Sequence, residues 1–392
     1  MTMSTSSIGP GGRSALAVVD VDAEIRALHE EATRRSGLSD FGGDDYLAPM
    51  RMLVEEMNKL TMCDAGRDFW REELIGTLIP RAAREKSWKE HPEWQNQKIS
   101  KPLVICGVPR TGTTALQKVM SIDPQFQGLE NWLSIWPMPR PPREEWSQHL
   151  GYRLAAGILE ARGAKIPGLT SQHEVVVDEV DECMEVMKLG FVNNRFPELA
   201  MIRDYDAFFQ AQDELTQYRE LADTLKLIGL NDDRPWLLKN PGHFVGIETL
   251  LKVFPDARVI VTHRDPLKAL ASLNSILSHP RKLIDPEIDL HVLGQRDLDY
   301  WSKGVEAMRR AGAQRPADQF HDVAHSDFHG DPIGTIRDIY DHFDLTLDEV
   351  TEERMRAWIA ANPAGKHGEH CYEPGDYGLD AKQVRAAFKD WC

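Results

Sequence analysis

Basic residues are the scarcer charge in this chain of 392 residues, which holds 46 lysines and arginines against 62 aspartates and glutamates. The net charge of −16 at pH 7 excludes a general binder of nucleic acid or of anionic membranes, because both partners need a basic surface. A small anion would have to be held by a local site that works against the overall charge. A homo-oligomer is compatible with this composition.

Cysteine is also scarce, since the five cysteines are odd in number and contain no Cys-x-x-Cys pair. This pattern excludes a disulfide framework or a zinc ribbon, and it favours a reducing cytoplasm. No apolar run approaches the roughly 18 residues that would cross a membrane. The Ser/Gly-rich start, residues 1–12, lacks the basic and apolar regions of a signal peptide, so we expect a disordered tail there.

The first hundred residues lack any strand pattern. Apolar side chains recur instead at steps of three and four over residues 23–84. This spacing predicts a helical N-terminal segment, residues 1–100, that covers the core or joins an interface. The polar stretch 86–101 is typical of a connecting loop.

Four short strand candidates, each followed by a helical pattern, mark the rest of the chain; the first three are mainly apolar and the fourth is mixed. They lie at residues 103–107, 236–239, 257–262 and 320–323. Strands that alternate with helices predict an α/β fold with a parallel sheet flanked by helices, here over residues 101–392. We expect functional residues where these strands end and the helices begin.

The clearest chemical signal is Gly107-Val-Pro-Arg-Thr-Gly-Thr-Thr114, between the first strand and its helix. Two glycines five apart permit a P-loop-like turn whose backbone N–H groups and following helix N-terminus hold an anion. The lysine of a nucleoside-triphosphate loop is replaced by Thr113, and the cation has moved to Arg110. Three alternatives stay open: a plain turn, a kinase with a displaced cation, and a noncatalytic nucleotide-binding protein.

The segment from Pro109 to Thr114 resembles the loop of sulfotransferases that use 3′-phosphoadenosine 5′-phosphosulfate (PAPS), and the whole chain resembles bacterial members of that family. The resemblance implies transfer of a sulfuryl group to a hydroxyl of a small molecule, lipid or glycolipid, leaving adenosine 3′,5′-bisphosphate (PAP), with no metal expected. It also implies which residues hold the 5′-phosphosulfate: Arg110, Thr111, Gly112, Thr113 and Thr114.

A second family motif follows the third strand, where His263-Arg264-Asp265-Pro266 is followed by Ser272. In the family such an Arg and Ser pair holds the 3′-phosphate of the donor. Arg264 offers a planar fork of donors for phosphate oxygens. Pairing of Arg264 with a nearby acid is the alternative interpretation.

Three further residues are candidates for catalysis itself. Lys239, at the end of the second strand, resembles the lysine that the family places near the bridging oxygen of the donor, and a structural salt bridge is its alternative. Two residues compete as the base: Glu130, which resembles the glutamate of tyrosylprotein sulfotransferases, and His243, which resembles the histidine of cytosolic ones. A histidine needs no tuning to act near neutrality, whereas a glutamate needs partial burial.

Two histidine-containing clusters carry weaker signals. Lys366 and His367, in a Gly-flanked loop, resemble a C-terminal contact to the 3′-phosphate, with an exposed loop as the alternative. His325 and His329 have the spacing of a metal pair, but Gly330-Asp-Pro would break the helix that such a pair requires. We therefore expect no metal site.

Two other stretches suit the acceptor side less directly. The acidic run 174–185 is typical of a solvated helix face. Trp132 and Trp136 either pack in the core or line an acceptor pocket, and an aromatic pocket would favour a lipid, phenolic or glycolipid alcohol.

Overall fold

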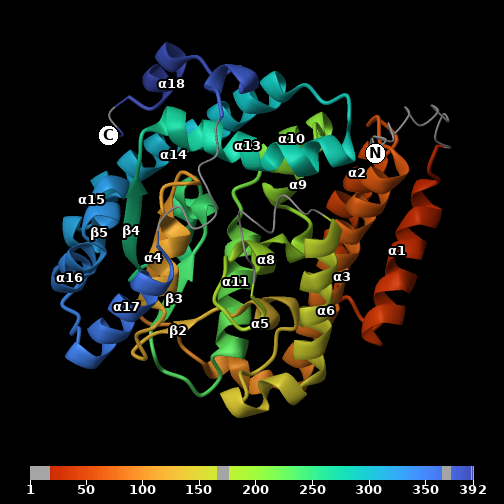
Figure 1. The fold of residues 1–392 in the computed structure, drawn as a ribbon. Helices are drawn as coiled ribbons and strands as arrows, with labels where there is room; N and C mark the ends of the chain where they lie inside the picture. Colours follow the sequence, from red (N-terminus) through yellow and green to blue (C-terminus); the bar gives the residue numbers. More distant parts are fainter. Residues whose placement is uncertain (1–17, 166–175, 364–371, 390, 392) are drawn as a thin grey trace, which may run out of the picture.

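The computed structural model describes residues 18–165, 176–363, 372–389 and 391. Its centre is a parallel sheet of five strands in the order β2-β3-β1-β4-β5, which confirms the predicted α/β class (Figure 1). The strands are β1 (Leu103–Gly107), β2 (Gln127–Gly128), β3 (Trp236–Lys239), β4 (Arg258–His263) and β5 (Phe320–Ala324).

Both faces of the sheet are buried, which explains why its strands are continuous apolar runs. In β1, Leu103 and Ile105 point to one core cluster, and Val104 and Cys106 point to the other. This is the alternation expected of a strand, whose successive side chains leave opposite faces. The sheet is therefore held in place by helices on both sides.

The helices divide between the two faces of the sheet. One face is covered by α4, α16 and α17, whose apolar residues share a cluster with Leu103 and Ile105. The other face is covered by the larger cluster, which also takes in the N-terminal helices. The helices are α1 (Val21–Ser36), α2 (Leu47–Glu56), α3 (Asp64–Glu90), α4 (Thr113–Met120), α5 (Asn131–Ile135), α6 (Leu150–Lys165), α8 (Met184–Met187), α9 (Arg195–Leu199), α10 (Arg203–Gln210), α11 (Leu215–Ile228), α12 (Ile247–Val253), α13 (Pro266–Ile284), α14 (Leu290–Gln314), α15 (His325–Gly330), α16 (Pro332–His342), α17 (Glu349–Ala361) and α18 (Ala381–Ala387).

The N-terminal segment is helical, as its apolar spacing predicts. Figure 1 shows α1, α2 and α3 on the flank of the molecule away from β5. The predicted connecting loop is wrong in its first part, because α3 continues through Glu90 and buries Ser87 on the way. The remaining polar stretch, up to β1, holds one short 3-10 turn at Pro92–Asn96.

Strand β1 lies between β3 and β4, so the carboxyl ends of these three strands meet at one edge. Gly107 pairs with Thr262, which brings the loop after β1 beside the end of β4. In an open parallel sheet, ligands bind in the crevice outside these ends. The described residues contain no helix long and apolar enough to cross a bilayer.

Candidate active site

The loop after β1 is bent into a tight turn by three residues with positive φ angles. These angles are 149° at Gly107, 71° at Arg110 and 97° at Gly112. A Cβ atom on Gly107 would lie 2.5 Å from the carbonyl oxygen of Thr262, so the approach of the loop to β4 requires glycine. The loop leads directly into α4, whose N-terminus adds partial positive charge.

The hydroxyl of Thr111 is engaged inside the protein. It donates to the carbonyl oxygen of Val108 at 2.7 Å and lies 2.5 Å from the hydroxyl of Thr262. The side chain therefore ties the loop to β4. Within the predicted anion site, Thr111 can offer its backbone N–H while its hydroxyl stabilises the turn.

The structure brings together Arg110, Arg264 and Ser272, which lie far apart in the sequence. The Nε of Arg110 donates to the Oγ of Ser272 at 3.3 Å, and Nη1 of Arg264 donates to the carbonyl oxygen of Arg110 at 2.8 Å. Burial and the charge of Arg264 lower the pKa of Arg110. Two adjacent guanidinium groups make a site that suits an anion, because a bound anion favours the charged form of both.

His325 borders the same site from the end of β5. Its ring is 3.5 Å from the position that a Cβ on Gly112 would take. Burial is the main cause that lowers the pKa of His325 to about 4, and the charges of Arg264, His329 and Arg110 add to it. The structure corrects the expectation that a helix cannot form here, because α15 begins at His325 and places its ring 4.6 Å from that of His329. The described residues contain no cluster of ligands suited to a metal ion.

Lys239 reaches the loop from the end of β3. Its Nζ donates to the Oγ1 of Thr114 at 3.3 Å and to Oε1 of Glu182 at 2.7 Å, and the lysine side chain is fully buried. The buried ammonium is thus paired, as its cost of desolvation requires. This contact connects the anion loop to a carboxylate that the sequence did not single out.

The acidic run 174–185 was expected to be a solvated helix face, and for its described part this expectation is wrong. Residues 176–182 form no helix and run along the chain at residues 129–131 instead. Glu179 pairs with Lys118 and Glu182 pairs with Lys239. The only signal in the sequence for these acids was their charge. Their spacing does not distinguish an acidic residue that lines a site from one on the solvent-exposed face of a helix.

A cavity of about 320 Å³ opens beside the loop. It is bordered by Arg110, Thr113 and Thr114 on the donor side and extends between helices from the N-terminal and C-terminal parts of the chain. Most of its lining is apolar, including Phe69 of α3, Ile135 of α5, Met187 of α8, Leu273 and Leu277 of α13, and Trp301 of α14. Among the described residues that line it, six are acidic and two are basic.

The two tryptophans considered for an acceptor pocket belong to the core. Trp132 is fully buried and packs against Trp146 with ring centres 5.6 Å apart. The same helix, α5, presents Asn131 and Ile135 to the cavity. A pocket with apolar side chains is thus present, but Asn131 and Ile135 line it in place of the adjacent Trp132 and Trp136.

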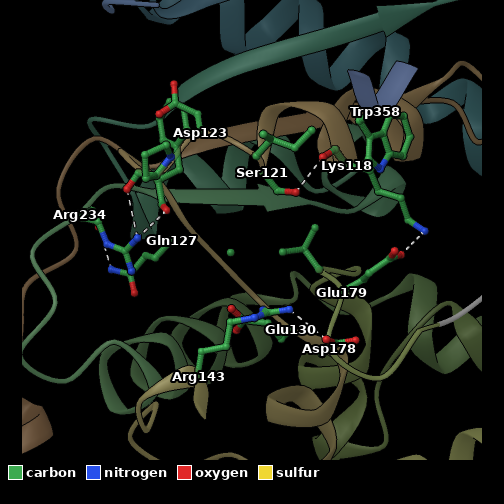
Figure 2. Close-up of a pocket in the computed structure, with 15 residues that line it drawn as sticks. Lys118, Ser121, Asp123, Gln127, Glu130, Arg143, Asp178, Glu179, Arg234 and Trp358 are labelled. Carbon is green, nitrogen blue, oxygen red and sulfur yellow. Dashed lines mark hydrogen bonds and ion pairs between the residues drawn. The ribbon is translucent and has the colours of Figure 1, made fainter. Parts of the chain in front are cut away.

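Glu130 lies in a different pocket from the cavity beside the loop, as Figure 2 shows. Its Oε2 is 3.1 Å from Nη2 of Arg140, and its neighbours in this second pocket include Arg143 and Asp178. Glu130 follows the phosphate loop closely in sequence, but helix α4 and the turn after it lead the chain to the outer end of β2. Among the described contacts, the carboxylate of Glu130 is paired with Arg140 and not with Arg110 or Lys239, and its assignment as the base stays a prediction.

His243 is also withdrawn from the cavity. It is fully buried, and its Nδ1 lies 3.0 Å from the hydroxyl of Tyr218. Burial, with the charge of Lys239, lowers the pKa of His243 to about 3. Asn240, Pro241 and Gly242 line the cavity and separate it from the ring, so the structure argues against His243 as the base.

The other predicted nucleotide contacts, Lys366 and His367, lie outside the described residues. The site as described is therefore built from the ends of β1, β3, β4 and β5. It places a cluster of cationic side chains next to an apolar cavity, and one carboxylate, Glu182, lies at the boundary between them.

This fold and site agree with the comparison to known protein families. The chain belongs to the sulfotransferase family, whose model matches residues 102–349. The chain is a sulfotransferase enzyme with the α/β fold of that family.

Particular relatives are mycobacterial. The crystal structure of sulfotransferase STF1 from Mycobacterium tuberculosis H37Rv superposes with a TM-score of 0.83 at 34% identity, covering 95% of this chain and 99% of that one. Sulfotransferase STF9 from Mycobacterium avium gives a TM-score of 0.82 at 25% identity, covering 97% of each chain. The omega-hydroxy-beta-dihydromenaquinone-9 sulfotransferase Stf3 of Mycobacterium bovis is 24% identical over 310 residues, which are 74% of this chain and 73% of Stf3.

Proposed function

We propose that this enzyme transfers a sulfuryl group from PAPS to the hydroxyl of a neutral, largely apolar small molecule or lipid. The observation that carries the proposal is the convergence of Arg110, Arg264 and Lys239 beside an apolar cavity. Cations at that edge suit the anionic donor, and the cavity suits a hydrocarbon acceptor. The products are the sulfate ester and PAP.

On the donor side, we assign the 5′-phosphosulfate to the loop 107–114 and its cation, Arg110. The backbone N–H groups from Gly112 to Thr114 begin α4, and such a helix start suits a phosphate oxygen. We assign the 3′-phosphate to Arg264 and Ser272, and we retain Lys366 and His367 as further contacts. The lowered pKa of Arg110 supports this assignment, because desolvation and the neighbouring Arg264 both oppose its positive charge and a bound anion would favour it.

On the acceptor side, the composition of the cavity supports a neutral molecule. The charged acidic residues of its lining would repel a carboxylate or a phosphate, and its apolar side chains, such as Phe69, Leu277 and Trp301, would bind hydrocarbon. The name of the relative Stf3, a sulfotransferase for a hydroxylated dihydromenaquinone, also favours a lipid alcohol over a glycolipid or an ionic sugar. We further propose that residues 1–100 serve the domain 101–392 by closing this cavity with Phe69 and Glu73.

Lys239 has a defined part in the proposed reaction. Its ammonium would offset the negative charge that develops as the bond between sulfur and the bridging phosphate oxygen breaks.

The cysteines Cys63, Cys106 and Cys183 are free, which is consistent with the reducing cytoplasm that we propose as the location.

The test is incubation with sulfur-labelled PAPS and a bacterial lipid extract, followed by mass identification of the labelled product. We expect a sulfated neutral alcohol and one equivalent of PAP. Absence of labelled product would contradict the proposal. Magnesium-dependent turnover of ATP that PAP does not inhibit would point to a kinase instead.

A further inference from the structure

Glu182 is held firmly at the boundary between the anion loop and the apolar cavity. The backbone N–H of the next residue, Cys183, donates to the carbonyl oxygen of Lys239 at 2.9 Å. On the other side, the N–H of Asp181 donates to the carbonyl oxygen of Leu129, also at 2.9 Å. These bonds fasten the segment to the end of β3 and to the chain before α5, so the position of Glu182 does not depend on its side chain.

The two carboxylate oxygens of Glu182 have different surroundings. Oε1 accepts from Nζ of Lys239 at 2.7 Å, while Oε2 has no partner among the residues that the structure describes. The Glu182 side chain is 20% exposed and lines the cavity, whereas the side chain of Lys239 is fully buried. One oxygen is thus used to orient the group, and the other is available to a molecule in the cavity.

Three other acids of the cavity, Asp181, Glu185 and Glu198, are less suited to meet a reacting hydroxyl. Oδ1 of Asp181 lies 4.0 Å from Nζ of Lys239, beyond hydrogen-bond distance. The backbone N–H of Asp181 donates to the carbonyl oxygen of Leu129, and its carbonyl oxygen accepts from the side chain of Gln117. Glu185 is engaged at 2.7 Å by Lys188. Glu198 accepts from Asn194 in α9, away from the loop.

Through Lys239, Glu182 is also connected to the donor side. The same ammonium reaches the Oγ1 of Thr114, at the start of α4. Glu182, Lys239 and Thr114 therefore form a continuous polar chain from the cavity to the anion loop. A general base has to lie within hydrogen-bond reach of the proton that it abstracts, and Glu182 lines the cavity that we assign to the acceptor.

We propose that Glu182 is the general base of sulfuryl transfer, an inference that rests on the proposed function. The acceptor's hydroxyl oxygen bonds to sulfur, and its proton passes to Oε2 of Glu182. The bond from sulfur to the bridging oxygen breaks, and its electron pair stays on the 5′-phosphate of PAP. Lys239 remains protonated throughout and balances the charge.

The experiment compares Glu182→Gln with a matched control, Glu179→Gln. Glu179 belongs to the same acidic segment and also pairs with a lysine, at 2.5 Å, but it lines the second pocket. Both variants are assayed with sulfur-labelled PAPS and geranylgeraniol, a neutral isoprenoid alcohol, in detergent micelles. PAP affinity is measured in parallel by titration calorimetry.

For Glu182→Gln, kcat is expected to fall by about 10²-fold or more, the usual scale of general-base catalysis, with PAP affinity within about threefold of wild type. The acid limb of the wild-type pH profile of kcat/KM should disappear, and Glu182→Asp should restore part of the rate. Glu179→Gln should keep the wild-type rate.

The possible outcomes separate the role of Glu182 from the proposed function. A Glu182→Gln enzyme that keeps its rate, or that slows while retaining the acid limb, would remove Glu182 from the proton transfer. A comparable loss in Glu130→Gln alone would return the role to Glu130. Absence of label transfer by the wild-type enzyme would instead contradict the proposed function itself.

Discussion

Burial and neighbouring charge set the protonation of individual side chains on the two sides of the site. On the donor side, the pKa values of Arg110 and His325 are lowered by burial and by nearby cations. On the acceptor side, burial raises the pKa values of Glu198 and Glu214 to about 7. Burial therefore favours the uncharged form on both sides: His325 is neutral near pH 7, and two carboxyl groups of the cavity are partly neutral there.

The raised pKa of Glu214 has a measurable consequence, because it makes the stability of the folded protein depend on pH. Its pKa is about 7 in the folded protein and about 4.5 in the unfolded chain, so the folded protein binds more protons between these values. Stability must then fall as pH rises through that window, and Glu214→Gln removes the effect. We expect the variant to gain stability relative to wild type by up to about 3 kcal/mol between pH 4.5 and pH 7.5, at about 1.4 kcal/mol for each pKa unit.

Urea unfolding at several pH values measures this gain. Glu353→Gln, at an exposed position of α17, serves as the control for the substitution itself. A stability difference between Glu214→Gln and wild type that does not change with pH would contradict the assigned protonation.

At the scale of structural elements, the loop between β1 and α4 depends on the close approach of its backbone to β4. Gly107→Ala would place a methyl group 2.5 Å from the carbonyl oxygen of Thr262 at a φ of 149°. We expect PAP affinity to fall by at least about tenfold while the overall fold persists, as judged by calorimetry and circular dichroism.

Gly312→Ala, in α14 with open space around it, is the matched control for that glycine. It should leave PAP affinity unchanged and stabilise the helix by about 0.5–1 kcal/mol. Unchanged PAP affinity in Gly107→Ala would show that the geometry of the loop is not needed for the nucleotide.

Helix α3 is expected to act on the acceptor alone, since Phe69 lines the cavity away from the loop. Phe69→Ala should raise the KM for geranylgeraniol about tenfold, equivalent to about 1.4 kcal/mol, and leave PAP affinity unchanged. Phe208→Ala, outside the cavity, should change neither value. A fall in PAP affinity with unchanged KM would contradict the assignment of α3 to the acceptor side.

The elements also explain what the sequence could predict. β1, β3 and β4 were predictable because strands buried on both faces are continuous apolar runs. β2 was not, because two residues at the sheet edge carry no pattern. Arg110, Arg264 and Ser272 were found by motif, and the structure brings them together.

The carboxylate that we propose as the base was beyond sequence reasoning for a physical reason. Distance along the chain does not give distance in space, so Glu130 follows the loop closely and still lies in another pocket. Glu182 is far from the loop in sequence and is brought back by backbone hydrogen bonds to Lys239 and Leu129. Pairing of this kind leaves no periodic trace in the sequence.

For the whole molecule, the net charge of −16 and the binding of an anionic donor are reconciled by geometry. Residues 231–283 hold eight lysines and arginines against five acids, a local charge of +3, and this stretch supplies Lys239 and Arg264. The fold directs these side chains to one edge of the sheet, where Glu182 pairs with Lys239. Such an arrangement suits one small nucleotide and not an extended polyanion.

The central claim, that this edge holds the donor by both of its phosphate ends, is tested most directly by titration calorimetry. PAP and adenosine 5′-phosphate are titrated into wild type, Arg264→Ala and the exposed control Arg309→Ala. We predict that wild type and the control bind PAP at least about tenfold more tightly than the 5′-phosphate, and that Arg264→Ala loses this difference. Equal affinities of the wild-type protein for the two nucleotides, or an undiminished preference in Arg264→Ala, would contradict the account.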